Sequence, residues 1–375
     1  MNNNNKILYI VDSSIDITGA FICVKNEAKI LKDEYNIVLV LPKNSKIKHE
    51  ELDIFNKVTY LPIVNIRKSF FNILAYLPSL AYCGWKLKKI MQKDNCSILQ
   101  INDFYLMQGI VANLFGFKGN IFTWVRIDPR RYGSFLSKYW LKYSYKYSHN
   151  IIANSNFIKN ILPKSSNNIL LYDPIYIRKI TDIDIIKKEL NTKKIIYISN
   201  YIRGKGQQYA IEAFLNITDK FPQAELHFYG GNMGLKKNKL YLEELKKMSK
   251  HTNKIYFHGF INNIETILKN AYIALNFSDS ESFSLTVLEA SYYGVPVVAT
   301  KSGGPQEIIL HDKTGLLVSI GNIKEMQIAI NKLLSKEELV IEMGIKAKKY
   351  IKKQFSEQVF KKNIIDIFEM KQDKI

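Results

Sequence analysis

The sequence predicts an α/β protein with two successive parallel sheets, each covered by helices. Three observations lead to this prediction. The chain has 375 residues, which is the length of two ordinary domains. At the N-terminus, a short apolar run is followed by a polar loop, a stretch with helical spacing and a second apolar run. The same order starts again at Lys194, so a second unit of the same kind is expected.

In the first half, short apolar runs predict strands, and apolar residues at helical spacing predict a helix between the first two. The predicted strands are Lys6–Val11, Asn36–Leu41, Ile98–Ile101, Ile121–Arg126 and Asn150–Ala153, and the predicted helix is Gly19–Lys32. The segment Leu170–Ile180 contains Pro174 and has little periodicity, so it is the predicted linker.

The second half repeats the pattern, with helices between strands and a basic helical tail. The predicted strands are Lys194–Ser199, Ala224–Tyr229, Lys254–Phe257, Tyr272–Phe277 and Val295–Thr300, and the predicted helices are Gln207–Lys220, Asn263–Asn270 and Leu285–Tyr293. We therefore expect an N-terminal domain at 1–175 and a C-terminal domain at 176–355. The helix at 356–375 is a candidate for crossing back to the first domain.

The charge and the cysteines restrict the partners and the compartment. A formal net charge of +20 indicates an anionic partner, which is nucleic acid, anionic lipid or a phosphorylated substrate, although a lysine-rich codon bias is an alternative cause. The three cysteines are far apart and form no CxxC pair, so a reducing compartment without disulfides or a zinc site is expected. The N-terminus lacks the pattern of a signal peptide. The apolar stretch Phe70–Trp85 is shorter than the roughly 20 residues that span a membrane. We expect a cytoplasmic protein.

The segment Ser278–Thr300 is the most informative for chemistry. It reads as a strand end, a serine-rich loop, a helix and a new strand, with Ser284 or Ser282 as the N-cap. Free amides and the positive end of a helix dipole would form an anion site suited to a diphosphate. Glu281, before the helix, could meet sugar hydroxyls, and Glu289, within it, could accept hydrogen bonds from a ribose diol.

This segment resembles the glutamate-x7-glutamate motif of the retaining family-4 glycosyltransferases (glycosyl transferases group 1). These enzymes have the GT-B fold, in which two Rossmann-like domains face each other across a cleft. Other segments resemble further elements of the family and follow in the family's order: Arg203–Gly206, Gly230-Gly231, His258–Phe260, Ser302–Glu307 and Thr314–Val318.

The resemblance implies roles for particular residues. Glu281, Lys205 and Arg203 would be catalytic, with the two cations holding the leaving diphosphate and Glu281 contacting the donor sugar. Asn200 stands where the family usually has an arginine, so either Arg203 takes over the phosphate contact or Lys205 and amides hold the diphosphate alone. The implied donor-binding residues are Gly19, Asn200, Gly230, Phe260, Ser282, Phe283, Ser284, Leu285 and Glu289.

The resemblance also implies a UDP- or GDP-linked sugar as co-substrate, no cofactor and no catalytic metal. Asp182-Ile183-Asp184 has the letters of a metal-binding DxD pair, but it falls in the predicted linker.

Acceptor-side candidates lie at predicted strand ends of the first half. Asp103 could be a base, with a helix cap as the alternative. Arg126 or Asp128 could face the acceptor, and Arg130 and Arg131 could clamp an acceptor phosphate. The alternative for this group is a structural ion-pair cluster.

Two stretches, Phe70–Lys89 and Lys138–Lys146, mix aromatic residues with lysines. They predict either contact with an anionic membrane or amphipathic helices packed on the sheet. The resemblance and the charge together imply a retaining glycosyltransferase for bacterial surface polysaccharide, acting on a glycan or lipid-linked acceptor at the inner face of the membrane. The alternatives are a hydrolase or a sensor of sugar nucleotides, and a basic nucleic-acid-binding protein. No recognised nucleic-acid module appears, so no nucleic acid is expected as a partner.

Overall fold

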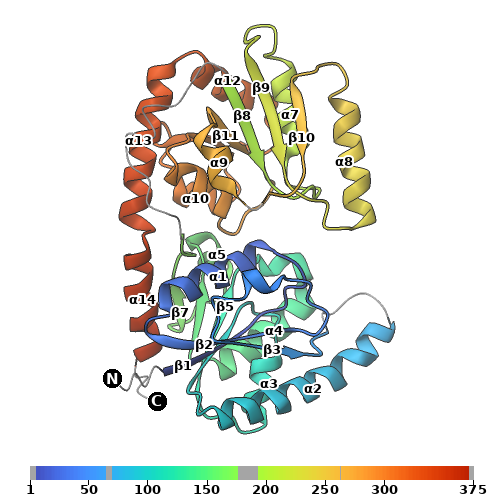
Figure 1. Ribbon diagram of the computed structural model, residues 1–375, viewed down its shortest axis with the longest axis vertical. Coiled ribbons are helices and arrows are strands. Elements are labelled where there is room, and N and C mark those ends of the chain that lie inside the picture. The colour runs from blue at the N-terminus through green and yellow to red at the C-terminus, as the bar shows by residue number, and fades with distance from the viewer. Residues whose placement is uncertain (1–5, 65–69, 176–192, 262, 371–375) are drawn as a thin grey trace. The chain divides into compact units, whose positions relative to one another are not determined.

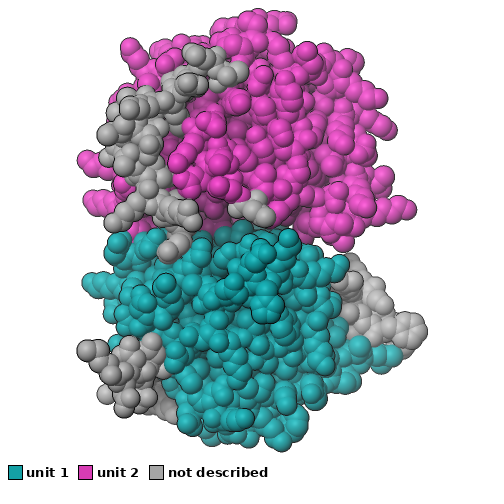
Figure 2. All heavy atoms as spheres, viewed as in Figure 1, with its two compact units in different colours: residues 1–176, 357–375 teal, residues 177–356 magenta. Residues whose placement is uncertain are grey.

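The protein consists of two compact α/β units (Figure 2). The structure, a computed structural model, describes residues 6–64, 70–175, 193–261 and 263–370. The first unit comprises residues 1–176 and 357–375, and the second comprises residues 177–356. Each unit contains one sheet with helices around it (Figure 1), which confirms the predicted fold class.

Within the described residues, the sheet of the first unit has seven strands in the order β3-β2-β1-β4-β5-β6-β7, and neighbouring strands are parallel. Their carboxyl ends therefore lie along one edge, where ligands bind in folds of this kind. The strands are β1 Lys6–Val11, β2 Tyr35–Pro42, β3 Lys57–Leu61, β4 Ile98–Ile101, β5 Asn120–Val125, β6 Asn150–Ala153 and β7 Asn168–Leu170.

Helices cover both faces of this sheet because alternate strand residues point to opposite sides. In β1, Leu8 and Ile10 pack in one apolar cluster, which includes Phe21 of α1, whereas Tyr9 and Val11 pack in another, which includes Leu87 of α2. The helices of this unit are α1 Gly19–Leu31, α2 Phe70–Lys93, α3 Gln108–Leu114, α4 Ser134–Tyr147, α5 Asn156–Ile161 and α14 Glu357–Glu369, with short 3-10 turns η1 His49–Glu51 and η2 Pro129–Tyr132.

The C-terminal helix α14 packs on the sheet of the first unit, although the strands of that sheet are far from α14 in the sequence. Phe368 lies 4.9 Å from Phe122 of β5 and 5.8 Å from Tyr35 of β2, measured between ring centroids. Ile364 is completely buried in the same cluster. The apolar face of α14 is thus part of the core that positions the strand ends of this unit.

The second unit repeats the architecture. Its described part has a six-stranded parallel sheet in the order β10-β9-β8-β11-β12-β13. The strands are β8 Lys193–Ile198, β9 Ala224–Tyr229, β10 Ile255–His258, β11 Ile273–Asn276, β12 Val297–Thr300 and β13 Gly315–Val318. The helices are α7 Gln207–Leu215, α8 Lys236–Met248, α9 Ile264–Lys269, α10 Leu285–Tyr292, α11 Pro305–Ile308, α12 Ile323–Leu334 and α13 Glu337–Gln354.

The structure differs from the predicted boundaries at a few places. The helix predicted to reach Lys220 ends at Leu215, because Asn216 caps it and hydrogen-bonded turns follow. The predicted linker begins too early, since Leu170 pairs with Ala153 in strand β7. Asp182-Ile183-Asp184 lies outside the described residues. In the described part of the chain, no helix is long and apolar enough to cross a membrane.

Candidate active site

The loop between β8 and α7 brings a lysine to the carboxyl edge of the second sheet. Gly206 has a φ of 76° and precedes α7. A Cβ on Gly206 would lie 1.9 Å from the carbonyl oxygen of Phe277, so only glycine allows this close approach. The loop is therefore held against the end of β11, and Lys205, just before this glycine, is placed beside the loop that follows β11.

Lys205 forms an ion pair with Glu281. Its Nζ lies 2.7 Å from Oε1 of Glu281, and the Ser278 hydroxyl donates to the same oxygen at 2.8 Å. Burial by itself would raise the pKa of Glu281, but Lys205, Ser278 and Asn276 outweigh it and lower the pKa. Glu281 is therefore an ionised acceptor at neutral pH. The lysine ammonium has three donors, so two remain for an anionic ligand.

The helix α10 begins at this site with an unusual backbone. Ser284 precedes α10 as predicted, but its hydroxyl makes no capping hydrogen bond; it pairs instead with the Asn276 amide at 3.1 Å. Ser284 has a φ of 92°, which costs a non-glycine residue on the order of 1–3 kcal/mol. The first turn of α10 therefore has no side-chain cap, and its amides are left for another acceptor.

Glu289 is a carboxyl group without a partner. It lies in the second turn of α10, and burial raises its pKa to about 8. Within the described residues, the carboxyl oxygens of Glu289 form no hydrogen bond and no ion pair. A half-buried carboxyl group in this state is suited to accept hydrogen bonds from a ligand's hydroxyl groups.

The remaining predicted residues of the second unit lie around this edge in different roles. Arg203 is exposed, forms an ion pair with Glu244 of α8 and lies over the ring of Tyr241 on the same helix. The Arg203 side chain therefore contacts α8, whereas the Lys205 side chain pairs with Glu281. Asn200 is structural, because its side-chain oxygen accepts from the amide of Gly231 at 3.1 Å.

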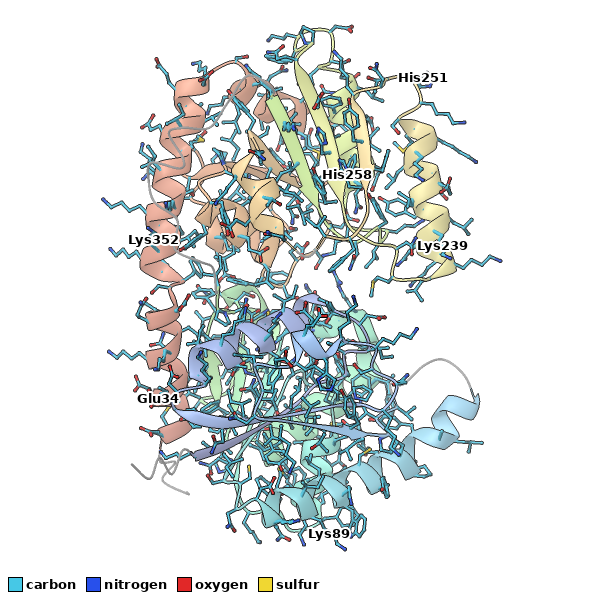
Figure 3. The ribbon with its side chains drawn as sticks, viewed as in Figure 1. Glu34, Lys89, Lys239, His251, His258 and Lys352 are labelled. Carbon is cyan, nitrogen blue, oxygen red and sulfur yellow. The ribbon has the colours of Figure 1, made fainter. Side chains whose placement is uncertain are left out.

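Gly230 and Phe260 lie near the ends of β9 and β10. A Cβ on Gly230 would approach the carbonyl oxygen of Ser199 to 2.0 Å, so glycine is needed here for close packing of two loops. Phe260 is 53% exposed and could stack on a ligand. Figure 3 labels the nearby His258 on the sheet of this unit.

The donor-binding roles of four further candidates remain predictions. Phe283 is buried, and its ring packs against Phe355 at 5.8 Å, which leaves only its main chain for a ligand. Ser282 and Leu285 are half-buried next to it. In the first unit, Gly19 is the exposed first residue of α1, and a Cβ there would meet open space. The packing of this unit therefore does not require a glycine at position 19, and the proximity of Gly19 to the donor phosphates stays a prediction.

Arg126 corrects the expectation for the acceptor side. It follows β5, is 6% exposed and forms ion pairs with Glu27 and Asp173, while its Nε donates to Asn102 at 2.9 Å. Its guanidinium also lies 3.8 Å from the ring centroid of Trp124. A guanidinium that is buried and neutralised in this way belongs to a structural ion-pair cluster and does not face an acceptor.

Asp103 and Asp128 are also engaged within the first unit. Asp103 accepts from the amides of Phe104 and Arg126, and burial raises its pKa to about 8 although these hydrogen bonds oppose the rise. Both hydrogen bonds hold one oxygen of the Asp103 carboxyl group within this unit, and its role as an acceptor-side base stays a prediction. Asp128 caps η2 and accepts from the Arg130 guanidinium at 2.6 Å, so the Asp128 carboxylate is engaged within this unit. Arg130 is exposed, and its contact with an acceptor phosphate stays a prediction.

Sequence reasoning did not single out Ser278 and Asn276. Both come directly from the end of β11: Asn276 is its last residue and Ser278 lies two residues later. Their amide and hydroxyl groups hold Glu281 and Ser284 in place. The sequence did contain a signal that could have identified both residues, because they are polar and lie at the carboxyl end of a predicted parallel strand.

The part of the chain that forms this site matches a known protein family. The family of glycosyl transferases group 1 matches residues 179–350, the part of the chain that contains Lys205, Glu281 and Glu289. The match confirms the resemblance to glycosyl transferases group 1 that the sequence motifs of this part of the chain indicated, whereas the retaining family-4 subtype stays a prediction.

Two curated relatives and one solved structure extend the comparison. N-acetyl-alpha-D-glucosaminyl L-malate synthase of Bacillus anthracis is 32% identical over 184 residues, which is 46% of this chain and 45% of that protein. The chain thus spans about half the length of this relative. O-antigen biosynthesis glycosyltransferase WbnH of Escherichia coli is 26% identical over 331 residues, covering 83% and 85% of the two chains. The structure of Anabaena HepE in complex with UDP and glucose superposes with a TM-score of 0.80 at 19% identity, covering 98% of this chain and 100% of that one. The chain therefore has the GT-B fold.

Proposed function

We propose that the protein transfers a sugar from a nucleoside-diphosphate sugar to a glycan or lipid-linked acceptor. The observation that carries this proposal is the ion pair between Lys205 and Glu281 at the uncapped N-terminus of α10. The Lys205 ammonium and the free amides of α10 are suited to bind a diphosphate. The ionised carboxylate of Glu281 is suited to accept hydrogen bonds from sugar hydroxyls. The relative named for O-antigen biosynthesis supports a role in bacterial surface polysaccharide assembly.

The proposed chemistry uses positive charge at the leaving group. As the anomeric C–O bond breaks, positive charge develops on the sugar ring and negative charge on the departing diphosphate. Lys205 and the amides of the first turn of α10 stabilise that negative charge, while Glu281 accepts hydrogen bonds from the sugar. Glu289 accepts from the ribose hydroxyls. The acceptor oxygen attacks the face from which the diphosphate leaves, so the configuration at the anomeric carbon is retained.

Release of nucleoside diphosphate from UDP- and GDP-linked sugars, with and without added acceptor, tests this proposal. A transferase gives a glycosylated acceptor in an amount equal to the nucleoside diphosphate released. Free sugar formed at the same rate with and without acceptor would identify a hydrolase. Donor binding without turnover toward a panel of acceptors would identify a sensor. Strong salt-sensitive RNA or DNA binding without sugar-nucleotide binding would contradict the proposal altogether.

We also propose that catalysis needs no metal ion, because Lys205 and the helix amides supply the positive charge that a metal would supply. Turnover is expected to stay within about twofold of its original value after dialysis against EDTA, as followed by nucleoside diphosphate release. A loss of turnover that manganese or magnesium restores would contradict metal independence.

The proposed partner of the first unit is an anionic membrane surface at α2. Leu74, Leu77 and Trp85 are 57%, 66% and 39% exposed on this helix. The ammonium of Lys89 lies 4.1 Å from the centroid of the Trp85 ring, and Lys89 extends from the end of α2 (Figure 3). Apolar side chains beside lysines suit a bilayer interface with anionic headgroups. A peripheral location at the inner face of the cell membrane would follow.

The double substitution of Leu77→Ser and Trp85→Ser is expected to weaken binding to vesicles that contain phosphatidylglycerol at least about tenfold, since each side chain loses on the order of 1.5–3 kcal/mol of apolar burial. Co-sedimentation measures this binding. Leu240→Ser is the matched control, because Leu240 is 56% exposed on a basic helix of the second unit. Unchanged binding of the double variant, or equal binding to neutral vesicles, would rule out this surface.

A further inference from the structure

A tyrosine hydroxyl lies between the two loops that carry Lys205 and Glu281. Tyr197 belongs to β8, and the neighbouring parallel strand β11 leads into the loop that contains Glu281 (Figure 1). Tyr197 is 1% exposed, and its ring packs against Phe228 at 5.5 Å and against Phe277 at 6.3 Å, measured between ring centroids. The ring is therefore fixed in the core, and the position of its hydroxyl oxygen is fixed with it.

The Tyr197 hydroxyl joins the two loops by two hydrogen bonds of opposite direction. It accepts a hydrogen bond of 2.7 Å from the amide of Phe277, the residue that directly follows β11. It donates a hydrogen bond to the carbonyl oxygen of Lys205, in the loop that follows β8. A hydroxyl group has one proton to donate and lone pairs that accept, so a single oxygen serves both loops.

This hydroxyl bridge fixes the backbone from which the lysine side chain extends. Beside the bridge, the amide of Asp279 donates to the carbonyl oxygen of Gly204 at 2.9 Å, so two consecutive carbonyl groups of the lysine loop are bonded. From this backbone, the Lys205 ammonium reaches Glu281 at 2.7 Å. A lysine side chain is a flexible four-carbon stem, so the place of its ammonium depends on where the backbone is held.

The Tyr197 hydroxyl keeps its proton at physiological pH. Burial raises the pKa of Tyr197 well above its usual value, and the Glu281 carboxylate adds to the rise, whereas the hydrogen bond from the Phe277 amide opposes it. A phenolate could not donate to the Lys205 carbonyl, but the neutral hydroxyl can. The bridge between the two loops is therefore present whenever the unit is folded.

We propose that Tyr197 is a positioning residue for the transfer reaction, and that its hydroxyl holds the Lys205 backbone where the ammonium meets the departing diphosphate. This inference rests on the proposed function. Tyr197 is buried, so it acts through Lys205 and not by contact with the substrate. A displacement of about 1 Å can lower a rate about 100-fold, which makes the placement of a flexible cation important for catalysis.

Tyr197→Phe removes the hydroxyl oxygen and keeps the ring. Turnover, measured as release of nucleoside diphosphate at saturating donor and acceptor, should fall at least about fivefold because Lys205 is no longer held in place. Tyr272→Phe is the matched control. Tyr272 is equally buried in the same apolar cluster, but its hydroxyl donates to the carbonyl of Leu333 in α12 at 3.5 Å. Turnover of the control should stay within about twofold of the original value.

The double variant of Tyr197→Phe and Lys205→Ala shows whether the hydroxyl acts through the lysine. Its turnover should lie within about twofold of that of Lys205→Ala alone, because the effects of residues that act as one unit do not add. A tyrosine that only stabilised the core would lower turnover by the same factor with or without the lysine. A further loss beyond this range would therefore overturn the inference.

Hydrogen exchange tests the bridge independently of turnover. Peptides that cover residues 202–206 and 276–281 should exchange at least about fivefold faster in Tyr197→Phe than in the unchanged protein, because the Phe277 amide loses its partner. In Tyr272→Phe they should exchange at the original rate. Equal exchange in the two variants would overturn the inference.

The unchanged protein, measured in the same turnover assay, separates this inference from the proposed function. Turnover that Tyr197→Phe does not reduce would overturn the role of Tyr197 and leave the transferase proposal intact. If the unchanged protein neither binds UDP or GDP nor releases nucleoside diphosphate, the proposed function is contradicted, and the role of Tyr197 in transfer is contradicted with it.

Discussion

Lys205→Ala is expected to lower turnover by on the order of 10²–10³, the usual effect of losing one group that stabilises developing charge. The lysine contacts Glu281 at 2.7 Å and has donors left for the diphosphate. Its loss removes positive charge from the leaving group and also leaves the Glu281 carboxylate without its cation. Steady-state release of nucleoside diphosphate, at saturating donor and acceptor, measures the effect.

Two other substitutions control this experiment. Lys332→Ala removes a lysine that pairs with Asp312 on the same unit at 2.6 Å, and it should leave turnover within about twofold of the original value. Arg203→Ala should have a smaller effect than Lys205→Ala, because the Arg203 guanidinium contacts α8. Turnover of Lys205→Ala close to that of the unchanged protein would remove this lysine from the mechanism.

Above about pH 8, where the Glu289 carboxyl group is ionised, Glu289→Gln is expected to weaken donor binding at least about tenfold, since hydrogen bonds to a charged acceptor contribute about 1.5–3 kcal/mol. The side chain lacks a partner in the described part of the chain and is placed on α10, so the ribose hydroxyls would be its donors. An amide has only one acceptor oxygen for the diol. Isothermal titration with the donor or with its nucleoside diphosphate measures the loss, and unchanged affinity would contradict the ribose role.

The same variant should be more stable than the unchanged protein at higher pH. Burial raises the pKa of Glu289 from 4.5 to about 8, so between these values the folded chain keeps a proton that the unfolded chain releases. The stability contributed by this group therefore falls as the pH rises through this window. Glutamine removes the effect. The melting temperature of the variant relative to that of the unchanged protein should rise between about pH 5 and about pH 8. A relative melting temperature that does not change across this range would contradict the raised pKa.

Local sequence signals were sufficient for the elements that meet at the carboxyl edge of the second sheet. The serine-rich loop indicated that a helix starts after Ser284, and the strand β11 before it was visible as an apolar run. The helix N-terminus is where predicted. The missing capping bond depends on Asn276, whose side chain turns toward Ser284 only in the folded unit.

The roles of Arg126 and Arg203 could not be derived from the local sequence, because each role depends on a carboxylate that is distant in the sequence and close only in the folded chain. Arg126 pairs with Asp173, and Arg203 pairs with Glu244, which is 41 residues away in sequence. A strand-end arginine looks the same in sequence whether it faces a ligand or a buried carboxylate.

In the proposed reaction, the second unit binds the diphosphate of the donor through Lys205 and the start of α10. Isothermal titration of UDP and GDP against UMP and GMP, with the unchanged protein and with Lys205→Ala, tests it most directly. We predict that one diphosphate binds at least about tenfold more tightly than its monophosphate, and that Lys205→Ala removes most of this difference. Equal affinity for monophosphate and diphosphate, or a preference that survives the loss of Lys205, would contradict the claim.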